Sequence, residues 1–312
     1  MIEIIINLIL TGLFFQAQLN EQKFFSDLIQ NNYRLPPAED KKIAKVAPQR
    51  DLGSTSLGVE VTAKSVLVLD KESEKILYEK NSQEARAIAS LTKLMTALVF
   101  LEHNPGWNQK IIIKADDYRP GATPYLVSGE EVTVRDLFAA SLIASSNEAT
   151  AALARASGLT NEEFIAAMNQ KAKDIGMAET AFVDVTGLAD GNQSTAQGVM
   201  LLIRIALAQP EIFKIISTKE YQVNILNKGL VRRIISTDRI LRQSFGLADK
   251  SYFVEAGKTG FLEKAGYCFA SQVSDKNNKK ILIVVLGSAS LDDRFIDTKS
   301  LAYWIFNNYI WQ

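Results

Sequence analysis

Three short patterns in this 312-residue chain combine residue types that could carry out nucleophilic chemistry. In the first, Ser90 precedes Lys93 by three residues at the start of the apolar segment 91–101. Residues three apart on a helix share a face, so the hydroxyl and the amine could meet there. Burial and the positive end of the helix dipole would both favour a neutral lysine, which can act as the base for a serine. The alternative is a capping serine beside a lysine that extends to solvent.

The second pattern is Ser145-Ser146-Asn147, which lies between two segments with helical periodicity. An S-x-N arrangement could place a hydroxyl and an amide side by side at the break between the helices. Ser and Asn are also common helix caps, and Asn147 precedes Glu148 at an expected helix start. A purely structural role as a cap is therefore the alternative interpretation.

The third pattern is Lys258-Thr259-Gly260, at the end of a strand-like run. A glycine in a strand often allows close approach by a ligand or another chain segment. The lysine and the threonine could bind a carboxylate through charge and a hydroxyl donor. A surface turn is the alternative interpretation of this pattern.

The composition narrows the chemistry that these patterns could support. Lys and Arg together number 35, as do Asp and Glu, which argues against a nucleic-acid-binding surface. The single histidine, His103, lies where the apolar helix must end, so a zinc hydrolase is disfavoured and a serine nucleophile would need another base. The single cysteine, Cys268, rules out an intramolecular disulfide and a multi-cysteine metal site.

Hydropathy divides the chain into three parts. Residues 1–17 are mostly apolar and resemble a signal or a short anchor, although a plain N-terminal helix is a further alternative. Residues 18–56 are polar with little periodicity and are expected to form a linker. Residues 57–312 show regular patterns throughout and are expected to form the catalytic domain.

The regular part predicts an α+β fold. Strand-like runs occur near both of its ends, at 59–70, 75–80, 220–226, 230–237, 252–260, 265–275 and 279–289. Helical periodicity occupies the segments 91–101, 134–144, 147–156, 161–176, 195–208 and 292–311. We therefore expect one antiparallel sheet built from N- and C-terminal strands and flanked by helices, with a helical lobe inserted between its two halves.

Taken together, the three patterns are typical of penicillin-binding proteins and class A β-lactamases. Each occurs once, in that order, and in the expected context of helix start, helix–helix break and strand. The chain resembles a low-molecular-mass penicillin-binding protein of the serine D-alanyl-D-alanine carboxypeptidase family, with a β-lactamase/transpeptidase-like fold, over roughly residues 57–310. The stretches that carry this resemblance are 65–102, 127–154, 182–190, 255–271 and 284–295.

The resemblance implies three catalytic residues: Ser90 as the acylated nucleophile, Lys93 as its general base and Ser145 as the relay of a proton to the leaving amine. It also implies a set of substrate-binding residues, namely Asn147, Lys258, Thr259, Gly260, Phe261 and Arg294.

Each member of this second set has an implied role. Asn147 would orient the substrate amide, and Lys258 would maintain the local field and help to keep Lys93 neutral. Thr259 would bind the terminal carboxylate with support from Arg294. The backbone N–H groups of Ser90 and Phe261 would form the oxyanion hole.

The implied reaction removes the terminal D-Ala from peptidoglycan stem peptides that end in D-Ala-D-Ala. β-Lactams would act as covalent inhibitors of the same serine, and no cofactor, metal or nucleic acid is implied. Such a protein would work outside the cytoplasm, exported by its N-terminal segment, with membrane association through that segment left open. Gln197 departs from the family, which usually has an acidic residue there; the packing of its helix is therefore in question.

Three other functions stay open at the level of the sequence. An endopeptidase that cuts D-Ala cross-links would use the same residues, and a non-enzymatic penicillin-binding sensor would keep the same fold. A class A β-lactamase is disfavoured because the E-x-x-L-N signature of its deacylating glutamate does not occur.

Overall fold

The computed structural model describes residues 46–119, 124–247 and 250–311. The segment 1–17 and most of the expected linker at 18–56 lie outside the described residues. The remainder belongs to one compact unit, Val46–Gln312. Within the described residues, no helix combines the length and the apolar character needed to cross a membrane.

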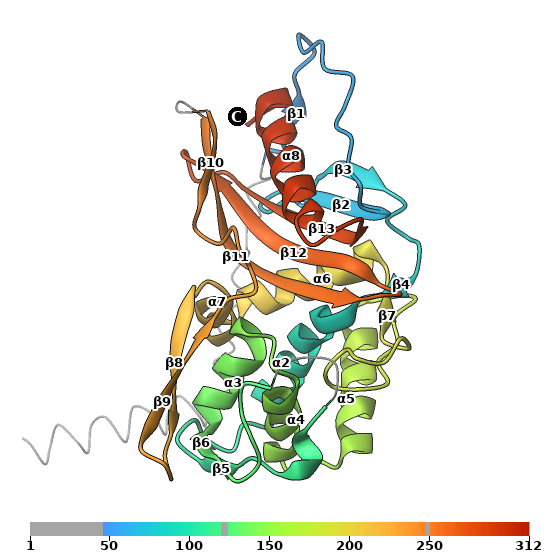
Figure 1. Ribbon diagram of the computed structural model, residues 1–312. Coiled ribbons are helices and arrows are strands. Elements are labelled where there is room, and N and C mark those ends of the chain that lie inside the picture. Colours follow the sequence, from blue (N-terminus) through green and yellow to red (C-terminus); the bar gives the residue numbers. More distant parts are fainter. Residues whose placement is uncertain (1–45, 120–123, 248–249, 312) are drawn as a thin grey trace, which may run out of the picture. The chain divides into compact units, whose positions relative to one another are not determined.

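A six-stranded antiparallel sheet forms the centre of this unit (Figure 1). Its strand order is β10-β11-β12-β13-β2-β3, so the N-terminal hairpin joins the C-terminal strands through the pair of β2 and β13. This confirms the prediction of a sheet built from both ends of the sequence. The strands are β2 (Ser65–Asp70), β3 (Ile76–Lys80), β10 (Ser244–Leu247), β11 (Lys250–Leu262), β12 (Gly266–Asp275) and β13 (Lys280–Ser288).

Strand β13 is apolar along almost its whole length because both of its faces are covered. Leu282 and Val284 belong to one hydrophobic cluster, whereas Ile281 and Ile283 belong to a second cluster on the other face. Successive side chains of a strand point to opposite faces, so an uninterrupted apolar run is what a doubly covered strand requires.

Helices cover the two faces of the sheet (Figure 1). Helix α8 (Asp293–Asn308) packs on one face, where Leu301 and Ile305 are fully buried in the second cluster. Helix α6 (Ala196–Ala208) contributes Val199 and Ile203 to the first cluster on the opposite face. The apolar face of each helix therefore fixes one side of the sheet that carries Lys258.

The helical lobe lies between the two halves of the sheet in the sequence, as predicted. It consists of α2 (Thr92–Glu102), α3 (Val134–Ile143), α4 (Asn147–Ala156), α5 (Asn161–Asp174) and the short α7 (Pro210–Ile216), together with the 3₁₀ turns η1 (Ala89–Leu91) and η2 (Ala115–Asp117). The side chains of Thr133, Ser146 and Thr160 cap α3, α4 and α5 by accepting from backbone N–H groups.

Two-stranded sheets complete the unit, and the sequence patterns did not distinguish them from the central sheet. The runs at 220–226 and 230–237 form a separate hairpin, and 59–64 is not part of a strand. The N–H groups of Thr62 and Ala63 donate instead to the carboxylate of Asp297, at 2.8 and 2.9 Å. The small strands are β1 (Gln49–Arg50), β4 (Arg86–Ala87), β5 (Lys110–Ile112), β6 (Glu131–Thr133), β7 (Gln193–Ser194), β8 (Glu220–Ile225), β9 (Leu230–Ile235) and β14 (Tyr309–Ile310).

Candidate active site

Ser90 lies in the 3₁₀ turn η1, one residue before the N-cap of α2. It does not cap that helix, because the N-cap residue is Leu91 and no side chain accepts a hydrogen bond there. The residue before it, Ala89, has a φ of 48°, which is costly for a residue with a Cβ. Backbone strain next to a half-buried serine is consistent with a functional turn rather than an ordinary helix start.

Lys93 is completely buried at the start of α2. Its Nζ lies 3.0 Å from Ser90 Oγ, 2.8 Å from Asn147 Oδ1 and 2.7 Å from the carbonyl oxygen of Thr186. A neutral amine has two N–H groups and one lone pair. The amide and carbonyl oxygens can take both N–H groups, which leaves the lone pair to accept the hydroxyl proton of Ser90. The alternative of a lysine that extends to solvent is wrong.

Burial lowers the pKa of Lys93 from 10.5 to about 7. The carboxylates of Asp184 and Glu148 act in the opposite direction and raise it. A pKa near 7 leaves a substantial fraction of the amine neutral at neutral pH, which is the condition for a general base.

In the turn between α3 and α4, one residue caps the helix and two others contact the buried lysines. Ser146 is the N-cap of α4, because its Oγ accepts from the N–H of Ala149 at 3.1 Å. Ser145 adopts a φ of 58° and accepts a hydrogen bond from Lys258. Asn147 is buried and accepts from Lys93. The capping interpretation of this pattern therefore holds for Ser146 alone.

Strand β11 brings the third pattern to the same place. Lys258 is buried, and its Nζ donates to Ser145 Oγ at 2.8 Å and to the carbonyl of Thr259 at 2.9 Å. Burial lowers the pKa of Lys258, and the positive charges of Lys93 and Arg294 lower it further. The buried amine of Lys258 is therefore less basic than an exposed lysine.

Gly260 allows β11 to approach the turn that holds Ser90 closely. A Cβ at this position would lie 2.8 Å from the carbonyl oxygen of Ile88 and 3.2 Å from the backbone nitrogen of Ser90. Phe261, the next residue, is about half exposed and stacks on Tyr267 with ring centroids 4.3 Å apart. The structure thus brings the backbone of the Lys258 strand next to the backbone of the serine.

The remaining two predicted residues lie around the end of the same pattern. Thr259 is buried, and its Oγ1 forms a 2.6 Å hydrogen bond with Oγ1 of Thr237. Arg294, at the start of α8, is also buried and donates from Nη1 to the carbonyl of Gly260 at 3.2 Å. Hydroxyls and a guanidinium are thereby gathered at one edge of the sheet.

Two groups of residues at the site were missed by the sequence patterns. Thr237 follows a strand of its own hairpin, and nothing near it in the sequence indicates that it meets Thr259. The second group is the turn 184–189, which supplies the carbonyl of Thr186 to Lys93. A signal for this turn exists in the spacing of Asp184 and Gly187, since Asp side chains often cap tight turns and glycine adopts positive φ.

Two further residues that the sequence drew attention to are His103 and Gln197. His103 is an exposed residue at the C-terminal end of α2, as predicted. Gln197 donates from its side chain to Ser82 Oγ at 3.3 Å and from its backbone to the Ser82 carbonyl. Within the described ranges, no three His, Cys, Asp or Glu side chains are grouped so that they could hold a metal ion.

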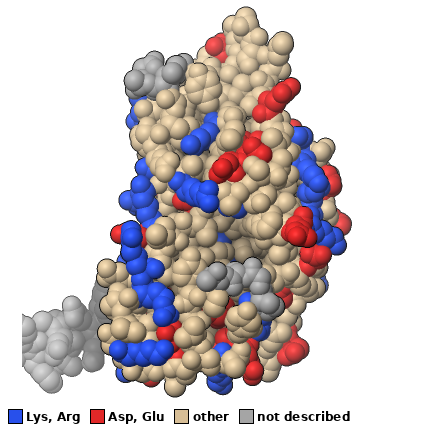
Figure 2. Space-filling model, in the orientation of Figure 1, with Lys and Arg blue, Asp and Glu red and all other residues tan. Residues whose placement is uncertain are grey.

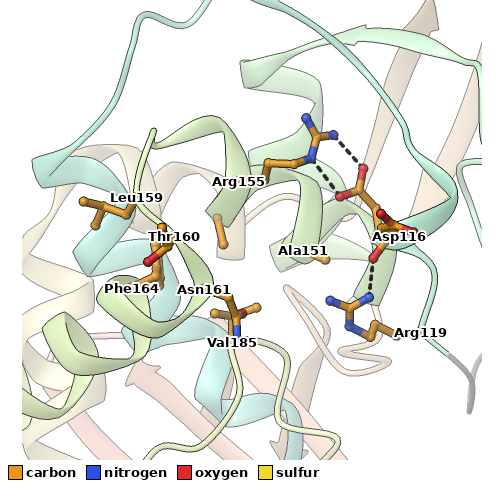
Figure 3. Close-up of a pocket in the computed structure, with 11 residues that line it drawn as sticks. Asp116, Arg119, Ala151, Arg155, Leu159, Thr160, Asn161, Phe164 and Val185 are labelled. Carbon is orange, nitrogen blue, oxygen red and sulfur yellow. Dashed lines mark hydrogen bonds and ion pairs between the residues drawn. The ribbon is translucent and has the colours of Figure 1, made fainter.

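The face shown in Figure 2 is hollowed where the sheet meets the helical lobe, and acidic and basic side chains are interspersed around it. One cavity of about 460 Å³ reaches this region, because Asp184 and Thr186 are among the residues that line it. An adjoining cavity of about 250 Å³ lies between α4 and α5 (Figure 3). Arg155 and Asp117 form an ion pair at its edge, and none of the predicted site residues lines it.

A search among solved structures finds the same fold. A penicillin-binding protein from Listeria monocytogenes, solved with ampicillin bound, has a TM-score of 0.68 and 30% sequence identity. The match covers 80% of this chain and 100% of that one. A Streptomyces DD-transpeptidase is 24% identical with a TM-score of 0.68, and supports the fold alone. The fold is that of penicillin-binding proteins and DD-peptidases.

The family model of D-alanyl-D-alanine carboxypeptidases matches residues 50–290, and the chain belongs to this family. It is 29% identical over 255 residues to the D-alanyl-D-alanine carboxypeptidase DacF of Bacillus subtilis, covering 79% of this chain. It spans only 63% of the length of that relative. A D-alanyl-D-alanine endopeptidase of Escherichia coli is 28% identical to this chain over 271 residues. The match covers 86% of this chain and 84% of the endopeptidase.

Proposed function

We propose that this protein is a serine-type D-alanyl-D-alanine carboxypeptidase that removes the terminal D-Ala from peptidoglycan stem peptides through an acyl-enzyme on Ser90. The observation that carries the proposal is the arrangement around Lys93. Its buried amine lies 3.0 Å from Ser90 Oγ, and two further oxygens take its remaining hydrogens. A hydroxyl within hydrogen-bond distance of a base with a pKa near 7 is the arrangement that nucleophilic catalysis requires.

In the proposed acylation, Ser90 Oγ attacks the carbonyl carbon of the penultimate D-Ala while its proton passes to Lys93 Nζ. The backbone N–H groups of Ser90 and Phe261 stabilise the oxyanion. The C–N bond then breaks, and Ser145 relays a proton to the departing amine of the terminal D-Ala. Water hydrolyses the resulting ester and regenerates the hydroxyl of Ser90.

The proposed substrate-binding residues surround this path. Asn147 orients the substrate amide, while Thr259 and Arg294 hold the terminal carboxylate through a hydroxyl and a positive charge. Lys258 donates to Ser145 and maintains the local field around that hydroxyl. Gly260 lets β11 lie close to the backbone of Ser90, so that the N–H groups of Ser90 and Phe261 can both face the substrate carbonyl.

Intact-mass analysis after incubation with a penicillin tests the nucleophile. We expect one covalent adduct, located on Ser90 by peptide mapping and absent from the variant Ser90→Ala. An adduct on another residue, or none on the native protein, would overturn the assignment. Release of free D-Ala from a synthetic peptide ending in D-Ala-D-Ala tests the reaction itself, and sustained hydrolysis of nitrocefin would instead indicate a β-lactamase.

A second activity, cleavage of D-Ala cross-links, is favoured by the relatives named endopeptidases, of which the Escherichia coli protein is matched over 84% of its length. The same serine and lysine would catalyse it. Digestion of purified monomeric and cross-linked muropeptides, followed by chromatography, separates the two activities. A protein that binds penicillin covalently but cleaves neither substrate would be a sensor.

We further propose that residues 1–17 export or anchor the protein, that 18–56 link this segment to the catalytic domain at 57–312, and that the protein works outside the cytoplasm. Its peptidoglycan substrate, and the β-lactams that would acylate it, are found there. Fractionation of cells that produce the full chain and a variant without residues 1–17 tests this, because the shortened variant should stay in the cytoplasm.

A further inference from the structure

A buried acid, Asp238, lies next to the proposed carboxylate-binding residues. Thr237 is hydrogen-bonded to Thr259, and the next residue, Asp238, is only 5% exposed. One oxygen of its carboxyl group, Oδ1, accepts from the N–H of Ile240 at 3.0 Å. The other oxygen, Oδ2, is buried and has no hydrogen-bond partner among the described residues. A buried carboxyl oxygen without a partner requires an explanation, because its desolvation is not compensated.

The backbone of β11 makes room for this oxygen. A Cβ on Gly257, the residue before Lys258, would lie 2.9 Å from Asp238 Oδ2. Arg294 is near enough for its charge to act on Asp238, and its Nε is likewise buried without a partner among the described residues. The two side chains form no direct ion pair, although their charges interact. A charge on Asp238 would therefore act on Arg294 through space rather than through an ion pair.

Burial raises the pKa of Asp238 to about 7, although the Ile240 N–H and the charge of Arg294 both oppose this. Arg294 from α8 is the charged group that acts on Asp238. The other ionisable groups that act on Arg294 are Cys268 and Tyr267 from β12 and Arg239 from the segment of Asp238. Burial raises the pKa of Cys268 to about 11, so the thiol stays neutral, and Arg239 is exposed and paired with Asp292. The local field thus depends mainly on the buried cations and on the state of Asp238.

We propose that Asp238 is a specificity-determining positioning residue that sets how strongly the site attracts the terminal carboxylate of the substrate. When its carboxyl group is protonated, the charge of Arg294 acts on the substrate carboxylate undiminished. When it is ionised, its negative charge offsets that of Arg294 and repels the substrate anion. The inference rests on the proposed function, because it assumes that Thr259 and Arg294 receive a carboxylate.

The proposal predicts that carboxylate recognition weakens as pH rises through neutrality. A penicillin and its methyl ester share the β-lactam ring and differ in the carboxylate. We expect the ratio of their second-order acylation rate constants to fall by about tenfold between about pH 6 and about pH 8.5 in the native protein. The ratio cancels the titration of Lys93, since the same base serves both compounds.

Variants separate Asp238 from other groups. Asp238→Asn keeps the shape and the oxygen that accepts from Ile240, so its ratio should be independent of pH and remain high. Asp292→Asn removes an exposed carboxylate at the start of α8 and should behave as the native protein does. A pH-independent ratio in the native protein overturns the inference even if Asp238→Asn fails to fold, and an unchanged pH dependence in Asp238→Asn overturns it as well.

Failure of the proposed function gives a different result. If neither compound acylates the protein, the proposed function is wrong, and the inference is then judged on Ser90→Ala by calorimetric binding of the same two compounds. A ratio of dissociation constants that shows the same loss of preference above neutral pH supports the role of Asp238. Equal binding of acid and ester at every pH overturns it.

Discussion

Two carboxylates limit how far burial can lower the pKa of Lys93. Complete burial disfavours the charged amine, but Asp184 and Glu148 stabilise it and hold the pKa at about 7. Asp184 is itself held ionised, because it accepts hydrogen bonds from Thr186, Gly187 and Ala189. Opposing effects therefore hold the pKa of Lys93 near neutrality, and the amine is not driven fully to the neutral form.

Replacement of Lys93 by arginine tests whether the amine must lose its proton. Lys93→Arg keeps a positive charge, but a guanidinium stays protonated at any accessible pH. We expect acylation by penicillin to slow by about 10²- to 10⁴-fold, the usual contribution of a general base. Near-normal acylation of this variant would show that the residue is not the base. Lys93→Met removes the amine without adding bulk and should lose the same activity, and circular dichroism of both variants controls for misfolding.

The pH dependence of acylation tests the poise of this base. Because the neutral amine is the active form, the acylation rate constant should rise about tenfold per pH unit below pH 7 and level off above it. Glu148→Gln removes one carboxylate that raises the pKa of Lys93, so this rising limb should move to lower pH. The glutamine oxygen can still accept from the backbone of Tyr125 and Leu126, as Oε1 of Glu148 does.

Rapid-quench acylation kinetics across the pH range measure this shift. Glu162→Gln, a change at an exposed carboxylate in the first turn of α5, is the matched control and should leave the limb in place because solvent screens its charge. Movement of the limb to higher pH in Glu148→Gln would contradict the assignment.

At the scale of elements, the turn 184–189 packs closely against the turn η1, which holds Ser90. Gly187 has a φ of 85°, and a Cβ there would lie 2.1 Å from the carbonyl oxygen of Ala89. The neighbouring carbonyl of Thr186 accepts from Lys93. A glycine at this point therefore allows one loop to contact both the turn that holds Ser90 and the amine of Lys93.

Gly187→Ala should abolish acylation, because the added methyl group displaces the turn from Ala89 and removes the acceptor of Lys93. Gly176→Ala is the matched control: its φ is 79°, but nothing lies within 4 Å of the added Cβ. The control should lose only about 1–2 kcal/mol of unfolding free energy from backbone strain and keep its acylation rate. Denaturant unfolding and penicillin adduct formation measure the two effects, and equal acylation rates in both variants would refute the role of this turn.

At the scale of the molecule, one sheet is shared by two hydrophobic cores. Leu94 of α2 lies in the core of the helical lobe and Leu301 of α8 lies in the core on the other face, and both are completely buried. Strands such as β13 contribute side chains to both cores, so loss of either core exposes the same sheet. We infer that the unit Val46–Gln312 unfolds cooperatively.

Leu94→Ala and Leu301→Ala should each lower the free energy of unfolding by about 2–5 kcal/mol, the range for a buried leucine replaced by alanine. Each variant should show a single transition that coincides by far-UV circular dichroism and tryptophan fluorescence. Two separated transitions in either variant would mean that the two cores unfold independently.

Much of this arrangement can be predicted from local patterns. The apolar runs at β2 and β13, the capped helices from α3 to α6 and the three motifs all follow from periodicity and residue type. The hairpin of β8 and β9 was not distinguished from the central sheet, since strand propensity does not identify the partner strand. Strand β2 begins only at Ser65 because the N–H groups of Thr62 and Ala63 donate to Asp297, which is distant in the sequence.

The sequence alone predicts which residues carry chemistry, because a lysine at the start of an apolar helix, a serine three residues before it and a K-T-G strand end are chemically unusual at these positions. Tertiary structure alone decided the charge state of that lysine, because Asp184, Glu148 and the carbonyl of Thr186 reach it from distant segments. The tertiary structure also brings Thr237 into contact with Thr259, and so places Asp238 close to the same residue. Desolvation and Coulomb interactions depend on distances in space, which residue spacing along the chain does not specify.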